Sequence, residues 1–376
     1  MQKALNELIV RIDKAVLHGK RPRSIGYNAR ISTHGPLISE QVVRIFSSGG
    51  KVGVGWSRVN KEQAQQLLGK RINEVFQLPQ GSFKEGLTVD LVLWDLTAKI
   101  MDMPLFRLLG ARGSREVELY DGSIYIDDLE ATDEEAVEIF RKEVKSGQEH
   151  GYRNFKIKIG RGARWMPTTE GMLRDVLVIN TVRASAGRDA KILIDANMGN
   201  TLNSAKEILR ACEGVDIYWF EEPFAEDPAL NRALKEFIEE KGYNTIIADG
   251  EFYPPPYFFD LVKEGWIDIV QHDFRQYGLT WWKATAAQLE QCGARCAPHT
   301  WGSYIERYAH AHFAASIPNF DLLEAAPAQI PGIVLNGWEM RDGKLIVPDS
   351  VGTGFDVDPD IFAEGIQDKN GFSVHL

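Results

Sequence analysis

The sequence predicts an α/β fold whose main part is a (β/α)8-type barrel. In the second half of the chain, short apolar segments alternate with longer segments of helical periodicity, a pattern typical of parallel strands joined by helices. Seven of the apolar segments end in a charged or metal-binding side chain, at intervals of about 22 to 37 residues. Because one strand, one helix and two loops have about this length, the spacing indicates a closed barrel with a charged mouth.

The first 116 residues lack this rhythm and predict a separate α+β unit. Leu5–Val16 alternates apolar and polar side chains, and Lys51–Trp56 follows a glycine pair, so an antiparallel sheet is expected. Lys61–Leu68 and Val89–Ile100 carry apolar residues three and four positions apart, which predicts two helices.

Residues 117–325 are predicted to form the barrel. The expected strands are Val117–Tyr120, Phe155–Ile159, Ile192–Ile194, Ile217–Phe220, Thr245–Ala248, Ile267–Gln271, Arg295–Ala297 and Leu322–Leu323. The expected helices are Thr132–His150, Met172–Ala186, Ala205–Cys212, Pro228–Lys241 and Trp281–Cys292. An open doubly wound sheet is the competing architecture, but it normally carries a G-x-G-x-x-G loop after its first strand, and no such loop stands in that position. Residues 326–376 are expected to return to the N-terminal unit or to cover the barrel.

The composition and charge of the chain argue against some classes of binding partner. The chain has 376 residues, of which 44% are hydrophobic, enough for a large core. Its formal net charge of −10 argues against nucleic acid or an anionic membrane as the main partner and favours a small ligand or a metal. No apolar run approaches the roughly 20 residues that span a bilayer, and the N-terminus lacks a secretory hydrophobic segment, so a cytoplasmic location is expected. The three cysteines, Cys212, Cys292 and Cys296, indicate neither a disulfide framework nor a zinc site.

Three carboxylates at predicted strand ends are candidate metal ligands. Asp195, Glu221 and Glu251 follow successive strands, so they are expected to meet at the barrel mouth. Like charges at close range need a cation between them, and ligation by oxygen alone favours Mg²⁺, with Mn²⁺ as the second choice. A single carboxylate in this position can instead cap the next helix. Asp249 lies two residues before Glu251 and is a rival for the third ligand position.

Two further groups are candidates for proton transfer. Lys156 and Lys158 share one face of a strand, and their mutual repulsion predicts a lowered pKa for one of them, which then acts as a base. The alternative is an exposed strand with solvated lysines. Asp273 and His299 end consecutive strands, so the carboxylate is expected to orient the imidazole as a general acid or base.

Two other residues in these motifs are His272 and Glu324. His272 is expected to face the helix layer, where it has no assigned role. Glu324 ends the last predicted strand, where a protonated carboxyl would donate a hydrogen bond to a developing oxyanion, or where it caps the closing helix.

Taken in order, these motifs resemble the enolase superfamily, and within it the mandelate racemase branch. The matching stretches are FKIKIG, LIDANMG, WFEEPF, ADGEFY, IVQHD, CAPHT and DLLEAAP, preceded by LWDLTAKIMDMPLFRLLGA. The resemblance implies a modified TIM barrel with an α+β capping domain built from the N-terminal part and the C-terminal tail. It implies that Asp195, Glu221 and Glu251 bind Mg²⁺, and it favours Glu251 over Asp249.

The resemblance also implies roles for the remaining site residues. Lys158 and His299 become the two acid/base groups, with Asp273 as the partner of His299. The other carried-over residues are Lys156 and Glu324 at the substrate carboxylate, and Asn197 and Glu222 near the metal. The chain departs from the family pattern at His272, where proline is common, and at Gln276–Leu279, where the family often has a basic residue and two glycines.

The implied reaction is removal of the α-proton of a carboxylate through a metal-stabilised enediolate. Dehydration of an acid sugar, an aldonate or aldarate, to a 2-keto-3-deoxy acid is the preferred reaction. Racemisation or epimerisation of a 2-hydroxy acid by the same lysine and histidine is the alternative, and a non-catalytic metal-binding barrel is a third. A basic loop over residues 18–30, with Arg21 and Arg23, is expected to cover the mouth. It either binds a distal carboxylate or hydroxyls of the substrate or is a solvated basic loop. Because relatives usually assemble, a homo-oligomer is expected.

Overall fold

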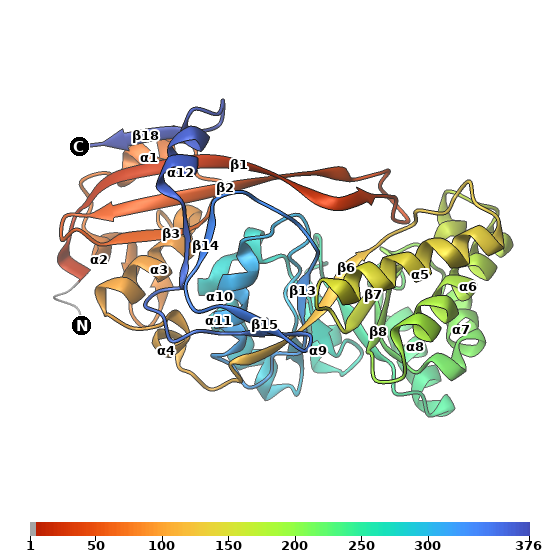
Figure 1. The fold of residues 1–376 in the computed structure, drawn as a ribbon. Coiled ribbons are helices and arrows are strands. Elements are labelled where there is room, and N and C mark those ends of the chain that lie inside the picture. The colour runs from red at the N-terminus through yellow and green to blue at the C-terminus, as the bar shows by residue number, and fades with distance from the viewer. Residues whose placement is uncertain (1–4) are drawn as a thin grey trace.

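Eight parallel strands close the barrel in the computed structural model, which describes residues 5–376 (Figure 1). Neighbouring strands pair in chain order, and the last strand pairs with the first. A short parallel bridge between Cys296 and Phe320 completes the ring. The strands are β6 Glu116–Ile124, β7 Asn154–Lys158, β8 Ile192–Asp195, β9 Ile217–Glu221, β10 Ile246–Asp249, β11 Ile269–Val270, β12 Arg295–Cys296 and β13 Leu323–Ala325. The closed ring confirms the predicted barrel and rules out an open doubly wound sheet.

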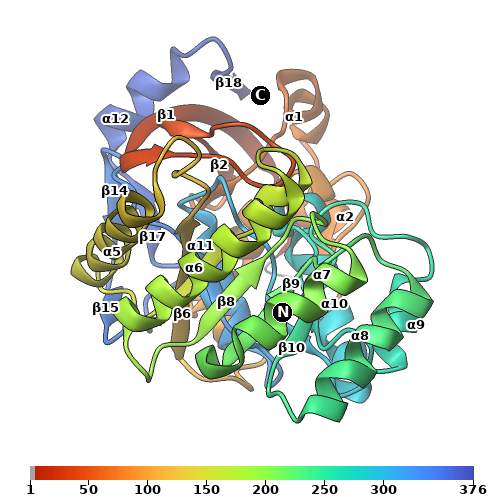
Figure 2. The same cartoon turned by 90° about the vertical axis from the view of Figure 1, so that its right-hand side faces the viewer.

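The connecting helices lie outside these strands (Figure 2). They are α5 Asp133–Glu149, α6 Thr168–Ala186, α7 Leu202–Ala211, α8 Pro228–Lys241, α9 Phe258–Lys263, α10 Phe274–Gln291 and α11 Glu306–Ala314. Neither α9 nor α11 was predicted from the sequence, and α10 begins seven residues before the predicted start at Trp281. In the part of the chain that the structure describes, no helix combines the length and apolar character needed to cross a membrane.

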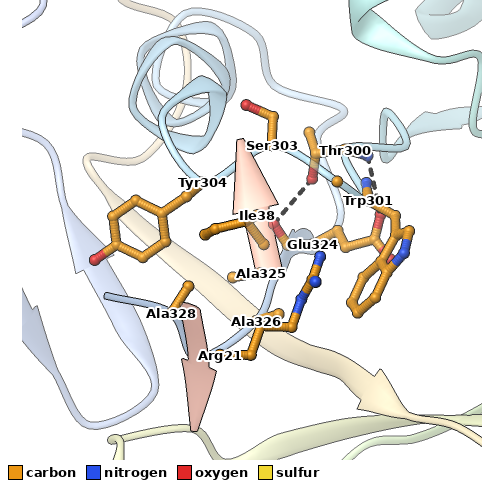
Figure 3. A pocket seen from close by; sticks show the side chains of 11 residues that line it. Arg21, Ile38, Thr300, Trp301, Ser303, Tyr304, Glu324, Ala325, Ala326 and Ala328 are labelled. Carbon is orange, nitrogen blue, oxygen red and sulfur yellow. Dashed lines mark hydrogen bonds between the residues drawn. The ribbon is translucent and has the colours of Figure 1, made fainter. Parts of the chain in front are cut away.

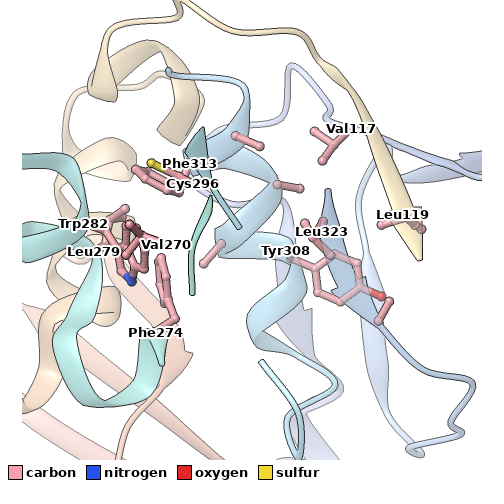
Figure 4. Packing of buried hydrophobic residues seen from close by; sticks show 14 of the residues in the cluster. Val117, Leu119, Val270, Phe274, Leu279, Trp282, Cys296, Tyr308, Phe313 and Leu323 are labelled. Atoms are coloured by element: carbon pink, nitrogen blue, oxygen red, sulfur yellow. The ribbon is translucent and has the colours of Figure 1, made fainter. Parts of the chain in front are cut away.

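Two apolar layers hold the barrel together. One fills its interior and contains Tyr120, Leu193, Trp219, Ala248, Ile269, Ala297 and Leu322. The other lies between the strands and the helices, where residues such as Val270, Phe274, Trp282 and Phe313 pack together (Figure 4). On β7 the alternation is strict, because Phe155 and Ile157 belong to the outer layer while Lys156 and Lys158 reach carboxylates at the barrel mouth.

A four-stranded antiparallel sheet, here called the capping sheet, covers one end of the barrel (Figure 1). Its order is β18 Phe372–His375, β1 Ile9–Ile25, β2 Gly35–Ser47 and β3 Val52–Trp56. The helices α1 Lys61–Leu67, α3 Asp90–Ile100 and α12 Pro359–Ile366 accompany it. Because β18 and α12 come from the C-terminal end, the chain returns to its N-terminal part after leaving the barrel.

The predicted loop over residues 18–30 is wrong for most of its length. β1 continues to Ile25 and stays paired with β2 through Lys20 opposite Leu37 and Ile25 opposite Gly35. β1 and β2, here called the capping hairpin, therefore reach over the barrel as one antiparallel arm, with an irregularity in pairing between Lys20 and Ile25. This extension was not predicted because residues 18–24 are polar or basic, contain Gly19 and Pro22, and lack the apolar alternation that marks a strand.

The remaining elements are short. They are α2 Ile72–Val75, β4 Phe76–Gln77, β5 Gly81–Ser82, α4 Leu105–Leu109, β14 Ile333–Leu335, β15 Glu339–Arg341, β16 Lys344–Ile346 and β17 Phe355–Val357. β16 pairs antiparallel with β6, so the C-terminal segment contacts the barrel before it reaches the capping sheet.

A kink at Gly278 joins α10 to the N-terminal part of the chain. Gly278 has φ 77° and ψ 166°, so the helix is interrupted there. The buried carboxylate of Asp90, on α3, accepts hydrogen bonds from the backbone N–H and the hydroxyl of Thr280. Asp90 thus caps the second half of α10, directly after residues 276–279, where the sequence departs from the family pattern.

The buried carboxylate of Asp95 connects three separate parts of the chain. It lies on α3 and accepts the backbone N–H of Val54 at 2.8 Å and that of Thr353 at 2.7 Å. Lys99 Nζ is 2.8 Å from the same carboxylate. The side chain of Asp95 is fully buried, so each of these groups depends on it for a partner.

Replacing Asp95 with alanine is expected to lower the free energy of unfolding by about 3–5 kcal/mol, because two backbone donors and an ammonium group lose their buried acceptor. Urea unfolding followed by circular dichroism measures the change. The exposed Glu134 on α5 is the control, and Glu134→Ala is expected to change stability by less than about 0.5 kcal/mol. Equal stability of Asp95→Ala and the wild type would show that this carboxylate does not connect the three segments.

Candidate active site

Three carboxylates meet at the carboxyl ends of neighbouring barrel strands. Asp195 is the last residue of β8, Glu221 is the last residue of β9, and Glu251 follows β10 by two residues. Each offers one carboxylate oxygen, and these oxygens lie within 4.8 Å of one another. All three side chains are buried, so their negative charges repel one another strongly unless positive charge lies nearby. They are called the carboxylate group below.

The donor set of the carboxylate group fits Mg²⁺. Oε2 of Glu221 and Oε2 of Glu251 are buried and have no hydrogen-bond partner among residues 5–376. Burial, together with the charge of Asp195, raises the pKa of Glu221 to about 8. Free, buried carboxylate oxygens under mutual repulsion are the ligands that a hard divalent cation neutralises. The rival Asp249 is outside this group, and its Oδ1 accepts the backbone N–H of Gly250 at 2.8 Å.

Both lysines of β7 bind these carboxylates. Lys156 Nζ donates to Glu221 Oε1 at 2.7 Å, and Lys158 Nζ donates to Asp195 Oδ2. Burial opposes the charged ammonium groups, but the neighbouring carboxylates outweigh it, so the pKa of each lysine lies above its ordinary value. The prediction of a lowered lysine pKa is therefore wrong for this arrangement, because it considered the repulsion between the lysines and not their carboxylate partners.

His299 lies between two carboxylates that come from different strand ends. Its Nδ1 is 2.9 Å from Asp273 Oδ2, and its Nε2 is 3.2 Å from Glu251 Oε1. Burial disfavours the imidazolium, yet the carboxylates of Glu251, Glu324 and Asp273 raise the pKa of His299. Asp273 therefore orients the ring so that Nε2 faces the carboxylate group.

Glu324 is ionised and joins the last strand to the loop after β12. Its Oε2 accepts the backbone N–H groups of Thr300 at 2.9 Å and Trp301 at 3.1 Å, and its Oε1 is 2.9 Å from Lys156 Nζ. Despite burial, Lys156 and His299 lower the pKa of Glu324 to about 2. The prediction of a protonated carboxyl is therefore wrong for this arrangement. The predicted cap of the closing helix is also wrong, because the side chain binds residues 300 and 301, which precede α11.

The structure separates the two arginines predicted to bind substrate. Arg21 lines a cavity with Glu324, Ser303 and Tyr304, and its guanidinium lies 5.1 Å from the ring centre of Trp301 (Figure 3). Arg23 instead pairs with Asp127 at 2.9 Å and Glu143 at 3.0 Å. Residues two positions apart on a strand share a face. The two arginines nevertheless diverge, because the acidic side chains of Asp127 and Glu143 bind Arg23. Arg23 is therefore a structural ion-pair residue here.

The other predicted residues lie where the sequence placed them. Asn197 Nδ2 donates to Glu222 Oε2 at 3.1 Å, and both side chains are fully buried beside the carboxylate group. His272 points into the helix layer, where its ring stacks on Tyr277 and Trp281 at centroid distances of 4.8 and 5.3 Å. Aromatic packing therefore replaces the proline that the family pattern has at position 272.

Some site residues were missed because they carry no charge or lie beyond a predicted strand. Tyr125 follows β6, which ends four residues later than predicted, and Lys158 Nζ lies 5.3 Å from the ring centre of Tyr125. Tyr125 also packs against Trp301 and His34, with centroid distances of 4.8 and 4.9 Å. An aromatic residue after the first barrel strand was the available signal, since strand ends line the mouth.

Glu251→Gln is expected to weaken Mg²⁺ binding by about 100-fold or more, because it removes one of three anionic ligands. Isothermal titration calorimetry with MgCl₂ measures the affinity. The matched control is Asp249→Asn, which neutralises a buried carboxylate two residues away and is expected to stay within about threefold of the wild type. The opposite ranking of the two variants would make Asp249 the third ligand.

Comparisons with known proteins agree with this geometry. Residues 140–361 match the family model described as Enolase C-terminal domain-like. The fold is similar to that of a mandelate racemase/muconate lactonizing protein from a Geobacillus species, complexed with magnesium and tartrate, at 33% identity and a TM-score of 0.94 over 99% of this chain and 98% of that chain. It is also similar to galacturonate dehydratase from Geobacillus, complexed with D-galacturonate and 5-keto-4-deoxy-D-galacturonate, at 34% identity and a TM-score of 0.93 over 98% of this chain and 99% of that chain.

A curated relative points to the same chemistry. Arabinonate dehydratase from Saccharolobus solfataricus is 29% identical over 286 residues, which cover 73% of this chain and 70% of the relative. The family model matches more than half of the chain, and the Geobacillus structures match nearly all of it. The protein therefore belongs to the enolase superfamily, as an enzyme of the mandelate racemase and muconate lactonizing family.

Proposed function

We propose that the enzyme dehydrates an acid sugar, removing the proton next to the carboxylate and the hydroxyl from the adjacent carbon. One observation carries the proposal. Lys158 Nζ binds Asp195, and His299 Nε2 lies 3.2 Å from Glu251, so both proton carriers border the same carboxylate group from different strand ends. A substrate carboxylate held at that group has its α-carbon within reach of a base and an acid.

Each residue of the site has a distinct part in the proposed reaction. Asp195, Glu221 and Glu251 hold the cation, which is Mg²⁺ or, as the second choice, Mn²⁺. When bound, it supplies positive charge that stabilises the negative charge developing on the substrate carboxylate. Lys158, once released from Asp195 and in its neutral amine form, takes the α-proton, and His299, oriented by Asp273, gives a proton to the departing hydroxyl. Lys156 and Glu324 position the substrate carboxylate and the loop after β12.

The substrate class extends to uronates. In D-galacturonate the carboxylate is at the opposite end from the aldehyde, so a 5-keto-4-deoxy product carries its keto group on the α-carbon and has lost the β-hydroxyl. This is the same change as from an aldonate or aldarate to a 2-keto-3-deoxy acid. The similarity to galacturonate dehydratase supports including uronates with aldonates and aldarates. A cytoplasmic location and a homo-oligomeric state stay predictions.

Racemisation of a 2-hydroxy acid is the second candidate. It is favoured by the placement of Lys158 and His299 on β7 and after β12, which are separate parts of the ring. Two acid/base groups that approach one carbon from different directions can remove a proton and return it on the other face.

The wild-type enzyme with Mg²⁺ is expected to convert at least one acid in a panel of uronates, aldonates and aldarates in D₂O to an α-keto product. Lys158→Met and His299→Asn are each expected to lower kcat by about 10²–10⁴-fold, because each removes one proton carrier. Nuclear magnetic resonance identifies the product and any α-deuterium. Deuterium incorporation without a keto product would favour the racemase, and full activity of both variants would refute the assigned roles.

We also propose that Arg21 binds a distal carboxylate or hydroxyls of the substrate. Its guanidinium lines the cavity that contains Glu324, and the groups that it contacts are carbonyl oxygens, such as that of Leu37 at 3.0 Å, so no carboxylate neutralises its charge through a hydrogen bond among the described residues (Figure 3). Burial lowers the pKa of Arg21, and an anionic ligand would offset that cost.

Arg21→Met is expected to lower kcat/KM for a diacid substrate by about tenfold more than for a monoacid, since a charge-assisted hydrogen bond to the second carboxylate is lost. Arg23→Met is the matched control from the same strand. It is expected to lower the melting temperature, because Asp127 and Glu143 lose their partner, while the diacid to monoacid ratio stays unchanged. An equal loss on both substrates in Arg21→Met would remove the proposed role.

A further inference from the structure

Arg275 holds the carboxylate that orients His299. Its Nη2 donates to Asp273 Oδ2 at 2.8 Å, and its Nε lies 3.4 Å from Asp273 Oδ1. Asp273 Oδ2 is also 2.9 Å from His299 Nδ1, and Oδ1 accepts the backbone N–H of Gln276 at 3.1 Å. Both oxygens of Asp273 are therefore fixed, and the guanidinium fork determines which of them faces the imidazole.

Arg275 also lies near a second buried carboxyl. Its Nε lies 3.7 Å from Oε2 of Glu306, the first residue of α11. Glu306 is fully buried, and neither of its oxygens has a hydrogen-bond partner among residues 5–376. Burial raises the pKa of Glu306 well above its ordinary value. The proposed reaction uses neither Arg275 nor Glu306, so this costly arrangement needs another explanation.

A third carboxyl connects this region to the capping hairpin. Glu40 on β2 is 1% exposed, accepts the hydroxyl of Ser303 at 3.1 Å and accepts the backbone N–H of Tyr304. Gly302 in the same loop is packed against the guanidinium, because a Cβ there would lie 3.1 Å from Arg275 Nη1. The loop that begins at His299 is thus held by the hairpin on one side and by Arg275 on the other.

We propose that Arg275, Glu306 and Glu40 form a positioning network that sets the orientation of the Asp273–His299 dyad and ties it to the capping hairpin. These three residues act through Asp273 and the loop of residues 299–304, and none of them is assigned a contact with substrate. The network deepens the proposed function and rests on the role given there to His299. The tautomer and the orientation of the His299 imidazole can both be measured without any substrate.

The decisive experiment compares Arg275→Met with Arg112→Met in the full-length protein. Arg112 pairs with Glu290 near the far end of α10, at 2.8 and 3.0 Å, and is the matched control for loss of an arginine–carboxylate pair at this helix. Nuclear magnetic resonance of ¹⁵N-histidine-labelled protein reports the Nδ1–H of His299, with His299→Asn for the assignment. The chemical shift of this Nδ1–H is expected to change in Arg275→Met and to keep its wild-type value in Arg112→Met.

Kinetics give the second readout. In Arg275→Met, kcat is expected to fall by about 10- to 100-fold with KM within about threefold, because a misplaced dyad slows proton transfer and leaves substrate contacts intact. Arg275→Lys is expected to recover part of kcat. Should the enzyme turn over none of the acids, the proposed function fails while the histidine signal still tests the network.

An unchanged His299 signal in Arg275→Met overturns the proposal. If Arg275→Met does not fold, Glu306→Gln and Glu40→Gln replace it, because both substitutions keep the side-chain shape. A shifted His299 signal in either variant supports the network, and wild-type signals in both overturn it.

Discussion

Repulsion among three buried carboxylates is the constraint on which the rest of the barrel mouth depends. Asp195, Glu221 and Glu251 lie too close together to remain charged without compensation. The protein supplies two ammonium groups and one imidazole, and each binds a different member of the group: Lys158 binds Asp195, Lys156 binds Glu221, and His299 lies beside Glu251. The proposed proton carriers are therefore also the counterions of the proposed metal ligands. A divalent cation bound to the three carboxylates would compensate their charge, and the basic groups would then be released for proton transfer.

A second constraint comes from the capping hairpin. The site is built at the ends of short strands, and β11 and β12 contain only two residues each, so the loops after them have little regular structure to hold them. Glu40 and Glu324 bind backbone N–H groups of the loop after β12 from two sides. Buried charge-assisted hydrogen bonds thus replace the rigidity that longer strands give.

The barrel was predictable because its strand ends carry charged residues at a regular spacing, and parallel strands bring such residues to one edge. Asp195 and Glu221 needed no further information, whereas the choice of Glu251 over Asp249 rested on the resemblance to the enolase superfamily. The partners of each side chain were harder to predict, because they come from other parts of the chain. The repulsion between Lys156 and Lys158 is evident in FKIKIG, whereas the carboxylates that outweigh it come from other strands. Arg21 and Arg23 have the same side chain two positions apart, yet only the tertiary neighbours of Arg23, Asp127 and Glu143, show that its charge is already paired. Tyr125 escaped attention since an aromatic residue carries no charge pattern.

The interruption of α10 at Gly278 bears on how this protein evolves and how it can be recombined. The second half of that barrel helix starts without a cap of its own, and the carboxylate of Asp90, from a helix nearly 190 positions earlier, completes it. A Cβ at position 278 would lie 2.8 Å from Asp90 Oδ2, so the two positions constrain each other. An exchange of the N-terminal part between relatives must therefore keep two matched residues, a glycine in the barrel and an acid in the donated segment.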